Sequence, residues 1–281
     1  MTEWFHESLY PSVRQSLRID NVVYRGKTKF QDVLIFENEY LGRVLVLDDV
    51  VQTTEADEFF YHETLSHVPI VGHGAAKAVL IVGGGDGGML EEVLKHPIDR
   101  AVLVDIDGEV VELCREHLSS ICGAAFDDPR TELMIGDGIE FVQTTEQRFD
   151  VIIVDSTDPV GPGEVLFGKP FYEACRSILS QDGVIVTQNG VPFFQGPELT
   201  QTHRFFSALF KWSGFFLVPV PTYSGGHMAF GWASDSRDLS VTDVSTVQSR
   251  LDLLSLETRY YNADVHVGSF ALPNCVRGLM S

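Results

Sequence analysis

The stretch that decides the fold runs from Ala78 to Leu94 and reads AVLIVGGGDGGMLEEVL. Its first five residues form a continuous apolar run of the length of a buried strand, and its last seven predict the opening turns of a helix. Glycines at Gly83, Gly85 and Gly88 lie between them in the spacing G-x-G-x-x-G. A strand, a glycine-rich turn and a helix in this order are typical of the first unit of a Rossmann-type domain that binds a nucleoside-containing ligand.

Further apolar runs of strand length follow along the chain, and most are separated by segments long enough for a helix. Buried strands that alternate with helices favour an α/β fold with a parallel, doubly wound sheet. The last two runs are joined only by PTYSGG, which predicts a final antiparallel hairpin. The seven expected strands are 78–82, 101–105, 131–135, 150–154, 183–188, 215–220 and 227–233.

The residues before this region have a different pattern. Short β-like runs at 21–26, 32–38 and 43–49 are separated by polar turns, which predicts a small antiparallel sheet. We therefore predict an N-terminal β-sheet domain over residues 1–70 and a seven-stranded, methyltransferase-like Rossmann domain over residues 71–281, which would carry the catalytic site.

The charge of the chain narrows the choice of ligand. Asp and Glu number 40 against 20 Lys and Arg, so the formal net charge is −20. Such a field disfavours nucleic acid and anionic membranes and favours small cationic ligands, although an acidic balance can also serve solubility alone.

The cysteines and the hydropathy pattern bear on the compartment. The four cysteines show no C-x-x-C pair and no histidines at zinc-finger spacing, so we expect reduced thiols and no metal. No apolar run reaches the ~18 residues that a membrane span needs, and the first residues do not have the pattern of a secretion signal. We expect a cytoplasmic protein.

Asp86, inside the glycine loop, indicates which nucleoside would bind. A dinucleotide would place its pyrophosphate against this loop, where a carboxylate would repel it. A ligand with a ribose, an adenine and a cationic tail fits better, although Asp86 could also act only as a carboxylate at a helix N-terminus. Asp105 ends the next strand, where a ribose-binding carboxylate is expected. The Asp137–Gly138 pair could meet the adenine edge or cap a helix.

The segment 154–168 reads VDSTDPVGPGEVLFG and places two further carboxylates close together. Asp155 ends the fourth of the seven strands, and the first and fourth strands flank the switch point of such a sheet. Asp86 and Asp155 should therefore face one crevice. Asp158 could line that crevice or form a turn. The glycines and prolines that follow predict a lid over residues 156–168.

Several of these motifs together resemble the spermidine synthase family, the polyamine aminopropyltransferases. The resemblance covers essentially the whole chain, in the family's order. It rests on DEFFYHE (57–63), VGGGDGG (82–88), DSTDPVGPGE (155–164), TQNG (187–190), PTYSGG (221–226) and RYYNADVHVGSFALP (259–273). It implies a homodimer that transfers an aminopropyl group from decarboxylated S-adenosylmethionine, a co-substrate rather than a cofactor, to putrescine. The products would be spermidine and methylthioadenosine.

The resemblance also implies a role for individual residues, with Asp155 as the general base. The donor would be bound by Gln31, Asp86, Asp105, Asp137, Gly138 and Pro162, around a glycine loop of Gly83, Gly84, Gly85 and Gly87. The amine would be bound by Tyr61, His62, Asp155, Asp158, Gln188 and Tyr223, of which His62 would also lie beside the donor. The ribose carboxylate is often Glu in the family and is Asp105 here, which bears on donor affinity.

The chemistry gives each carboxylate a separate task. A primary amine has a pKa near ~10.4 and is protonated at neutral pH, so Asp155 would accept its proton before it attacks the donor. Asp86 would hold the donor's ammonium and repel the additional carboxylate of ordinary S-adenosylmethionine.

Other interpretations stay open at this point. The acceptor could be cadaverine, agmatine or spermidine, and the assembly could be a tetramer. The same scaffold could serve a small-molecule methyltransferase or a polyamine sensor without turnover. Tyr61 and Tyr223 could be packing aromatics, and His62 a core histidine.

Overall fold

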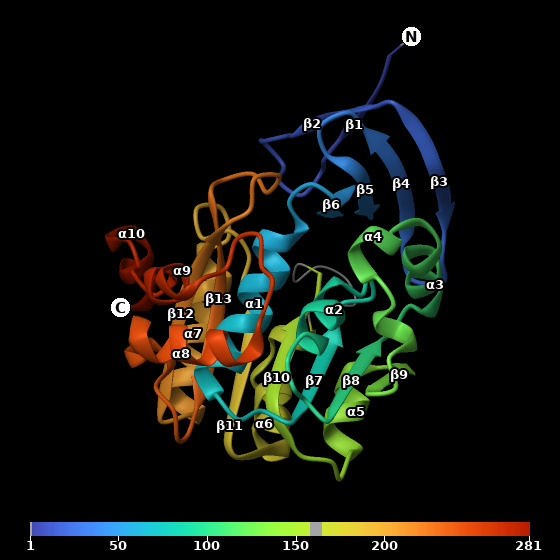
Figure 1. Cartoon of the computed structure of the whole chain (residues 1–281). Helices are drawn as coiled ribbons and strands as arrows, with labels where there is room; N and C mark the ends of the chain where they lie inside the picture. The colour runs from blue at the N-terminus through green and yellow to red at the C-terminus, as the bar shows by residue number, and fades with distance from the viewer. Residues whose placement is uncertain (1, 158–164) are drawn as a thin grey trace.

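The computed structural model describes residues 2–157 and 165–281 of the chain. They form a two-stranded ribbon, a four-stranded antiparallel sheet and a seven-stranded mixed sheet flanked by helices, which confirms the predicted α/β class. In Figure 1 the N-terminal sheets lie above one end of the large sheet. Within the described ranges, no helix combines the length and the apolar character needed to cross a membrane.

The N-terminal part contains the predicted antiparallel sheet and two features that the sequence did not reveal. The predicted runs correspond to β3 (Asn21–Lys27), β4 (Asp32–Asn38) and β5 (Gly42–Leu47). The sheet also includes β6 (Val50–Thr54), and the ribbon pairs β1 (Glu3–His6) with β2 (Ser16–Ile19).

Both faces of this four-stranded sheet are covered. Because side chains alternate along a strand, Ile35 on β4 packs against a helix of the large domain, whereas Phe36 packs with Phe5 of the ribbon. The N-terminal sheet is thus joined to the large domain by an apolar contact.

The large sheet follows the predicted order of runs closely. Its strand order is β12-β13-β11-β10-β7-β8-β9, with parallel pairing from β11 to β9. The final pair, β12 and β13, is antiparallel, as the short connection predicts. The strands are β7 (Ala78–Gly83), β8 (Arg100–Asp105), β9 (Thr131–Ile135), β10 (Phe149–Asp155), β11 (Leu179–Gln188), β12 (Trp212–Pro219) and β13 (His227–Ser234).

Helices cover both faces of the large sheet. One apolar cluster joins the sheet to α1, α2 and α8, and a second joins its other face to α5, α6 and α7. The helices are α1 (Glu58–His73), α2 (Gly88–Leu94), α3 (Gly108–His117), α4 (Ser119–Cys122), α5 (Gly138–Thr144), α6 (Lys169–Ile178), α7 (Gly196–Leu209), α8 (Val244–Leu254), α9 (Ala263–Ser269) and α10 (Asn274–Arg277).

The topology places two predicted carboxylates beside each other. Strands β7 and β10 are parallel neighbours, and Asp155 at the end of β10 is paired with Gly83 at the end of β7. Both strands therefore end at the switch point, beside the loop that carries Asp86.

Candidate active site

A pocket of about 430 Å³ lies at the carboxyl ends of β7, β8 and β10, bounded on one side by the N-terminal domain. Most of the residues expected from the sequence line it. These are Gln31, Tyr61, His62, Gly83, Gly84, Gly85, Asp86, Asp105, Asp137, Gly138, Asp155, Gln188 and Tyr223.

Three other predictions have a different outcome. Gly87 lies behind the pocket, where its α-carbon faces Cys122 and Phe126. Asp158 and Pro162 lie outside the described residues, as does most of the segment for which we predict a lid. Among residues 2–157 and 165–281, no group of three or more His, Cys, Asp or Glu side chains is arranged to hold a metal ion.

The glycine loop lets three strand ends converge. Gly83 has a φ of +85°, and a Cβ on it would collide with the backbone of Asp155. The amide of Gly84 donates to the carbonyl of Asp155 at 2.9 Å. A Cβ on Gly85 would lie 2.8 Å from a carboxylate oxygen of Asp105. The glycines are therefore needed for close approach of the carboxylates.

Asp155 lies against an aromatic wall. The hydroxyl of Tyr61 donates to its Oδ1 at 2.7 Å, and the Tyr61 ring packs edge-on against Phe230. Burial and the nearby charge of Asp86 raise the pKa of Asp155 to about 6. The carboxylate is thus more basic than an ordinary aspartate and is still ionised at neutral pH.

Asp86 is paired with a buried histidine. His62 Nε2 lies 3.6 Å from Asp86 Oδ2, and His62 Nδ1 lies 2.8 Å from Glu58 Oε2. Burial disfavours the imidazolium, but the two carboxylates raise the pKa of His62 well above its ordinary value. Burial likewise disfavours the Asp86 carboxylate, yet His62 holds its pKa below the ordinary value. Asp86 is therefore ionised and faces the pocket.

The carboxylates at the ends of β8 and β9 are held by backbone amides. Asp105 Oδ1 accepts from the amide of Asp107 at 2.8 Å, and burial raises the pKa of Asp105 to about 6. Asp137 accepts from the amide of Ile139 at 2.8 Å, so it caps α5 as well as lining the pocket.

The polar groups of Gln188 and Tyr223 are engaged with the backbone. Gln188 donates to the carbonyls of Ser156 and Thr157 at 3.0 and 3.1 Å and accepts from the amide of Gly190. Tyr223 donates to the carbonyl of Gln52. Both side chains line the pocket, and Gln188 also fixes the start of the segment after β10.

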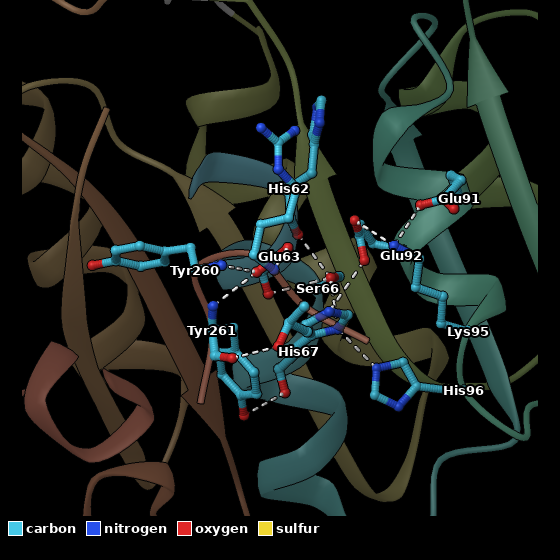
Figure 2. Close-up of polar contacts among 12 residues, drawn as sticks. His62, Glu63, Ser66, His67, Glu91, Glu92, Lys95, His96, Tyr260 and Tyr261 are labelled. Carbon is cyan, nitrogen blue, oxygen red and sulfur yellow. Dashed lines mark hydrogen bonds and ion pairs between the residues drawn. The ribbon is translucent and has the colours of Figure 1, made fainter. Parts of the chain in front are cut away.

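Behind the pocket, α1 is anchored to the C-terminal segment (Figure 2). The carboxylate of Glu63 accepts hydrogen bonds from three consecutive amides, those of Arg259, Tyr260 and Tyr261, at 2.6, 2.9 and 2.7 Å. This carboxylate is buried, and these bonds satisfy it. The start of the motif at 259–273 thus holds α1 in place, and α1 carries Tyr61 and His62 of the pocket.

A second buried polar group ties α1 to α2. His67 Nδ1 lies 2.9 Å from His96 Nε2, and His67 Nε2 lies 3.1 Å from Glu92 (Figure 2). Lys95 forms an ion pair with Glu92 at 2.8 Å. Burial lowers the pKa of His67 to about 3, so the ring is neutral. These contacts fix the distance between the helix of His62 and the helix that follows Asp86.

Several pocket residues were not foreseen from the sequence. Glu58 lies four residues before His62, and helical spacing could have predicted their contact. Glu7 and Tyr10 line the end of the pocket formed by the N-terminal domain, and no local motif marks them. Asp107 does not line the pocket itself but lies behind Gln31, whose side chain it contacts.

Comparison with known families agrees with this geometry. The spermine/spermidine synthase domain matches residues 58–243, and the spermidine synthase tetramerisation domain matches residues 3–55.

Individual proteins resemble the chain over nearly its full length. It is 53% identical to polyamine aminopropyltransferase 1 of Pseudomonas aeruginosa, over 97% of this chain and 96% of that protein. A polyamine aminopropyltransferase of Ruegeria sp. is 52% identical, with 98% of each chain covered.

Two solved structures share the fold. A spermidine synthase in complex with the transition-state analogue AdoDATO has a TM-score of 0.94 at 40% identity, covering 99% of this chain and 94% of the other. The spermidine synthase of Thermotoga maritima has a TM-score of 0.91 at 38% identity, with the same coverage. The chain belongs to the spermine/spermidine synthase family, the polyamine aminopropyltransferases.

Proposed function

We propose that this protein is a spermidine synthase, which transfers the aminopropyl group of decarboxylated S-adenosylmethionine to putrescine and releases spermidine and methylthioadenosine. The observation that carries the proposal is the meeting of three carboxylates in one pocket. Asp86 follows β7, Asp155 ends the neighbouring strand β10, and Asp105 ends β8 on the other side of β7. Asp86 and Asp155 suit cationic groups, and Asp105 suits a ribose.

The donor would lie across the glycine loop. Asp105 and Gln31 would accept from the ribose hydroxyls, and the Asp137–Gly138 pair would meet the adenine. Asp86 would bind the ammonium of the aminopropyl group. Ordinary S-adenosylmethionine carries a carboxylate beside that ammonium, and its repulsion by Asp86 would reject the wrong donor.

The acceptor would enter along the wall formed by Tyr61 and Tyr223. One ammonium loses its proton to Asp155, and the neutral nitrogen attacks the methylene carbon next to the sulfonium. A carbon–nitrogen bond forms and a carbon–sulfur bond breaks. The sulfur leaves as the neutral thioether of methylthioadenosine. Since the sulfonium already activates the carbon, the reaction needs no metal and no cofactor.

The other residues expected at the amine site would act by holding their neighbours in place. His62 would keep Asp86 in place beside the reacting carbon, and Gln188 would hold the backbone that follows Asp155. Glu7 lies in the same pocket and could meet the far end of a longer acceptor, so acceptors other than putrescine are a second candidate.

The assembly and the compartment are part of the same proposal. We infer a homodimer that can associate further, supported by the match of residues 3–55 to a tetramerisation domain. We also infer a cytoplasmic location, supported by four free cysteines, of which Cys114, Cys122 and Cys175 are buried.

Donor selection provides the test. Calorimetry should show that the wild type binds decarboxylated S-adenosylmethionine much more tightly than S-adenosylmethionine. Asp86→Asn should weaken the first ligand and narrow the ratio between the two. Asp99→Asn, which changes an exposed carboxylate paired with Lys77, is the matched control and should leave the ratio unchanged. An unaltered ratio in Asp86→Asn would show that donor selection lies elsewhere.

A further inference from the structure

We propose that Asp107 is a positioning residue that fixes which end of the Gln31 side-chain amide faces the donor, and that it thereby makes the pocket selective for a ribose with both hydroxyls. This inference rests on the proposed function, because it takes the ligand beside Gln31 to be a nucleoside.

The contacts of Asp107 define the arrangement. It is buried behind the pocket wall, at 1% exposure, between the N-terminal sheet and α3. Its Oδ2 accepts from the side-chain amide of Gln31 at 2.9 Å and from the hydroxyl of Thr28 at 2.5 Å. Its Oδ1 accepts from the amides of Glu109 and Val110 at 3.2 and 3.3 Å, which caps α3.

These contacts determine the orientation of the Gln31 amide. Oδ2 of Asp107 accepts its hydrogen bonds from Gln31 and Thr28, so Gln31 turns its NH₂ group toward Asp107. Its amide oxygen is then left for the pocket, which Gln31 lines, and it has no partner among residues 2–157 and 165–281. Gln31 therefore presents an acceptor to the ligand.

The backbone of Asp107 organises a second acceptor. Its amide donates to Oδ1 of Asp105 at 2.8 Å, which holds the carboxylate at the end of β8. One residue thus orients two acceptors, the Gln31 oxygen and the Asp105 carboxylate. Two acceptors that line one pocket suit a ligand with two neighbouring hydroxyl donors, which describes the 2′ and 3′ positions of a ribose.

Thr28 completes the link to the N-terminal sheet. Its hydroxyl accepts from the amides of Phe30 and Gln31 at 3.1 and 3.2 Å while it donates to Asp107. The turn before β4 is therefore fixed on Asp107 by two side chains. Ordering of this turn and binding of the ribose should depend on the same carboxylate.

The substitution Asp107→Asn separates the proposed role from the helix cap. Asparagine caps a helix as well as aspartate does, so α3 should keep its N-cap. If the oxygen of the introduced asparagine keeps the hydrogen bonds to the first amides of α3, its NH₂ group takes the place of Oδ2 and faces Gln31. The Gln31 amide must then turn over and present NH₂ to the ribose, where an acceptor is needed.

The reverse change at Gln31 should restore the pattern. Gln31→Glu alone sets two carboxylates against each other, which disfavours the native arrangement. In the double variant Asp107→Asn/Gln31→Glu, the introduced asparagine donates to one oxygen of the introduced glutamate, and the other oxygen faces the ribose. Each single change should impair binding, and the pair should recover it.

The experiment measures the dissociation constant of methylthioadenosine by calorimetry in four proteins, the wild type, both single variants and the double variant. We expect each single variant to bind about tenfold more weakly, which is the usual effect of losing one hydrogen bond and leaving a polar group unsatisfied. The double variant should return to within about threefold of the wild type. Thr28→Val is the matched control, because it removes the other contact to Oδ2 without turning the amide over, and it should weaken binding less than Asp107→Asn.

A second probe separates the ribose from a general loss of structure. The wild type should bind the 2′-deoxy and 3′-deoxy forms of methylthioadenosine more weakly than methylthioadenosine itself. The substitution Asp107→Asn should reduce the affinity for at least one of these deoxy forms by a smaller factor than it reduces the affinity for methylthioadenosine. Additive losses in the double variant, or equal losses for all three ligands, would overturn the proposal. A wild type that does not bind methylthioadenosine would overturn the proposed function as well, whereas tight binding that Asp107→Asn leaves unchanged would overturn this inference alone.

Discussion

Three aspartates of the pocket differ in their surroundings, and Asp86 therefore differs from the other two in its pKa. Asp86 has a cationic partner in His62, which holds its pKa low. Asp105 and Asp155 form no ion pair with any described residue, and burial raises the pKa of each to about 6. Asp86 is thus suited to permanent charge, whereas Asp155 is suited to accept a proton.

Asp155→Asn tests the base. Asparagine keeps the size of the side chain and can still accept from Tyr61, but it cannot take a proton. We expect kcat to fall by ~10²–10⁴ while the affinity for methylthioadenosine stays within a few-fold. Steady-state kinetics at saturating diamine, with calorimetry on the same preparations, would measure both. A kcat close to that of the wild type would remove Asp155 from the proton transfer.

The pH dependence of kcat/KM provides a second prediction. A carboxylate can accept a proton only when it is ionised, so if Asp155 is the base, kcat/KM for the diamine should fall as the pH is lowered through about 6. Tyr61 donates to the ionised form of Asp155 and stabilises it. Tyr61→Phe should therefore raise the pKa of Asp155 and move the acidic limb of the pH profile to higher pH. Tyr172→Phe removes a hydroxyl on the other face of the sheet and should not move it. A limb that stays in place in Tyr61→Phe would contradict the assignment.

Helices α1 and α2 approach each other closely beside the pocket. The ring of His62 on α1 occupies the space in which a side chain on Gly88, the first residue of α2, would lie. Contacts between His67, Glu92 and His96 hold the same two helices together one turn farther along. The position of Asp86 relative to His62 is therefore a property of the helix pair.

Gly88→Ala tests this packing. The added methyl group should push the His62 ring away from Glu58 and Asp86, and overpacking of this kind costs about 1–3 kcal/mol. We expect weaker binding of the decarboxylated donor and a lower free energy of unfolding. Gly136→Ala is the control, because a Cβ added there would have no atom of the described residues within 4 Å beyond its own chain neighbours. Equal effects of the two substitutions would show that the close approach at Gly88 does not matter.

The elements also show what a sequence pattern can predict. The five parallel strands were predictable because most of them are buried on both faces, which leaves a continuous apolar run. The ribbon strand β2 reads SLRI and has no such run, so it was missed. The domain boundary predicted at residue 70 stays a prediction. In the structure α1 spans that position, and the buried side chains of α1 pack with the core of the large domain.

The same contrast applies within the site. The strand-end carboxylates were predictable because topology alone places Asp86 and Asp155 together. The link between Gln31 and Asp107 joins residues 76 positions apart, and no local pattern encodes it. The contact of Glu58 with His62 follows helical spacing and could have been found.

For the whole molecule, the pocket carries a cost in stability that its ligands would relieve. The chain has a formal charge of −20, and the pocket gathers several carboxylates whose mutual repulsion and burial disfavour ionisation of Asp155. The folded-state pKa of Asp155, about 6, lies above the ordinary value of ~3.9, so the folded protein binds this proton more tightly than the unfolded chain. The destabilisation is therefore complete above pH 6 and fades as the pH falls toward 4.

Asp155→Asn should accordingly stabilise the ligand-free protein at pH 8. The pKa shift, discounted because the carboxylate lines an open pocket, corresponds to a gain of about 1–2 kcal/mol in the free energy of unfolding. Urea unfolding at pH 8 and near pH 4.5 would measure it, and the gain should shrink at the lower pH. A variant less stable than the wild type at pH 8 would mean that the Asp155 charge has a partner in the free protein.

The reaction itself is best examined by identifying the products. The purified protein would be incubated with decarboxylated S-adenosylmethionine and a panel of putrescine, cadaverine, agmatine and spermidine, and in parallel with S-adenosylmethionine, followed by mass analysis. We predict methylthioadenosine and spermidine in equal amounts with the decarboxylated donor and putrescine, and little product from S-adenosylmethionine. Formation of S-adenosylhomocysteine would instead indicate a methyltransferase, and the absence of any product would leave a protein without turnover, such as a polyamine sensor. Either result would contradict aminopropyl transfer by this pocket.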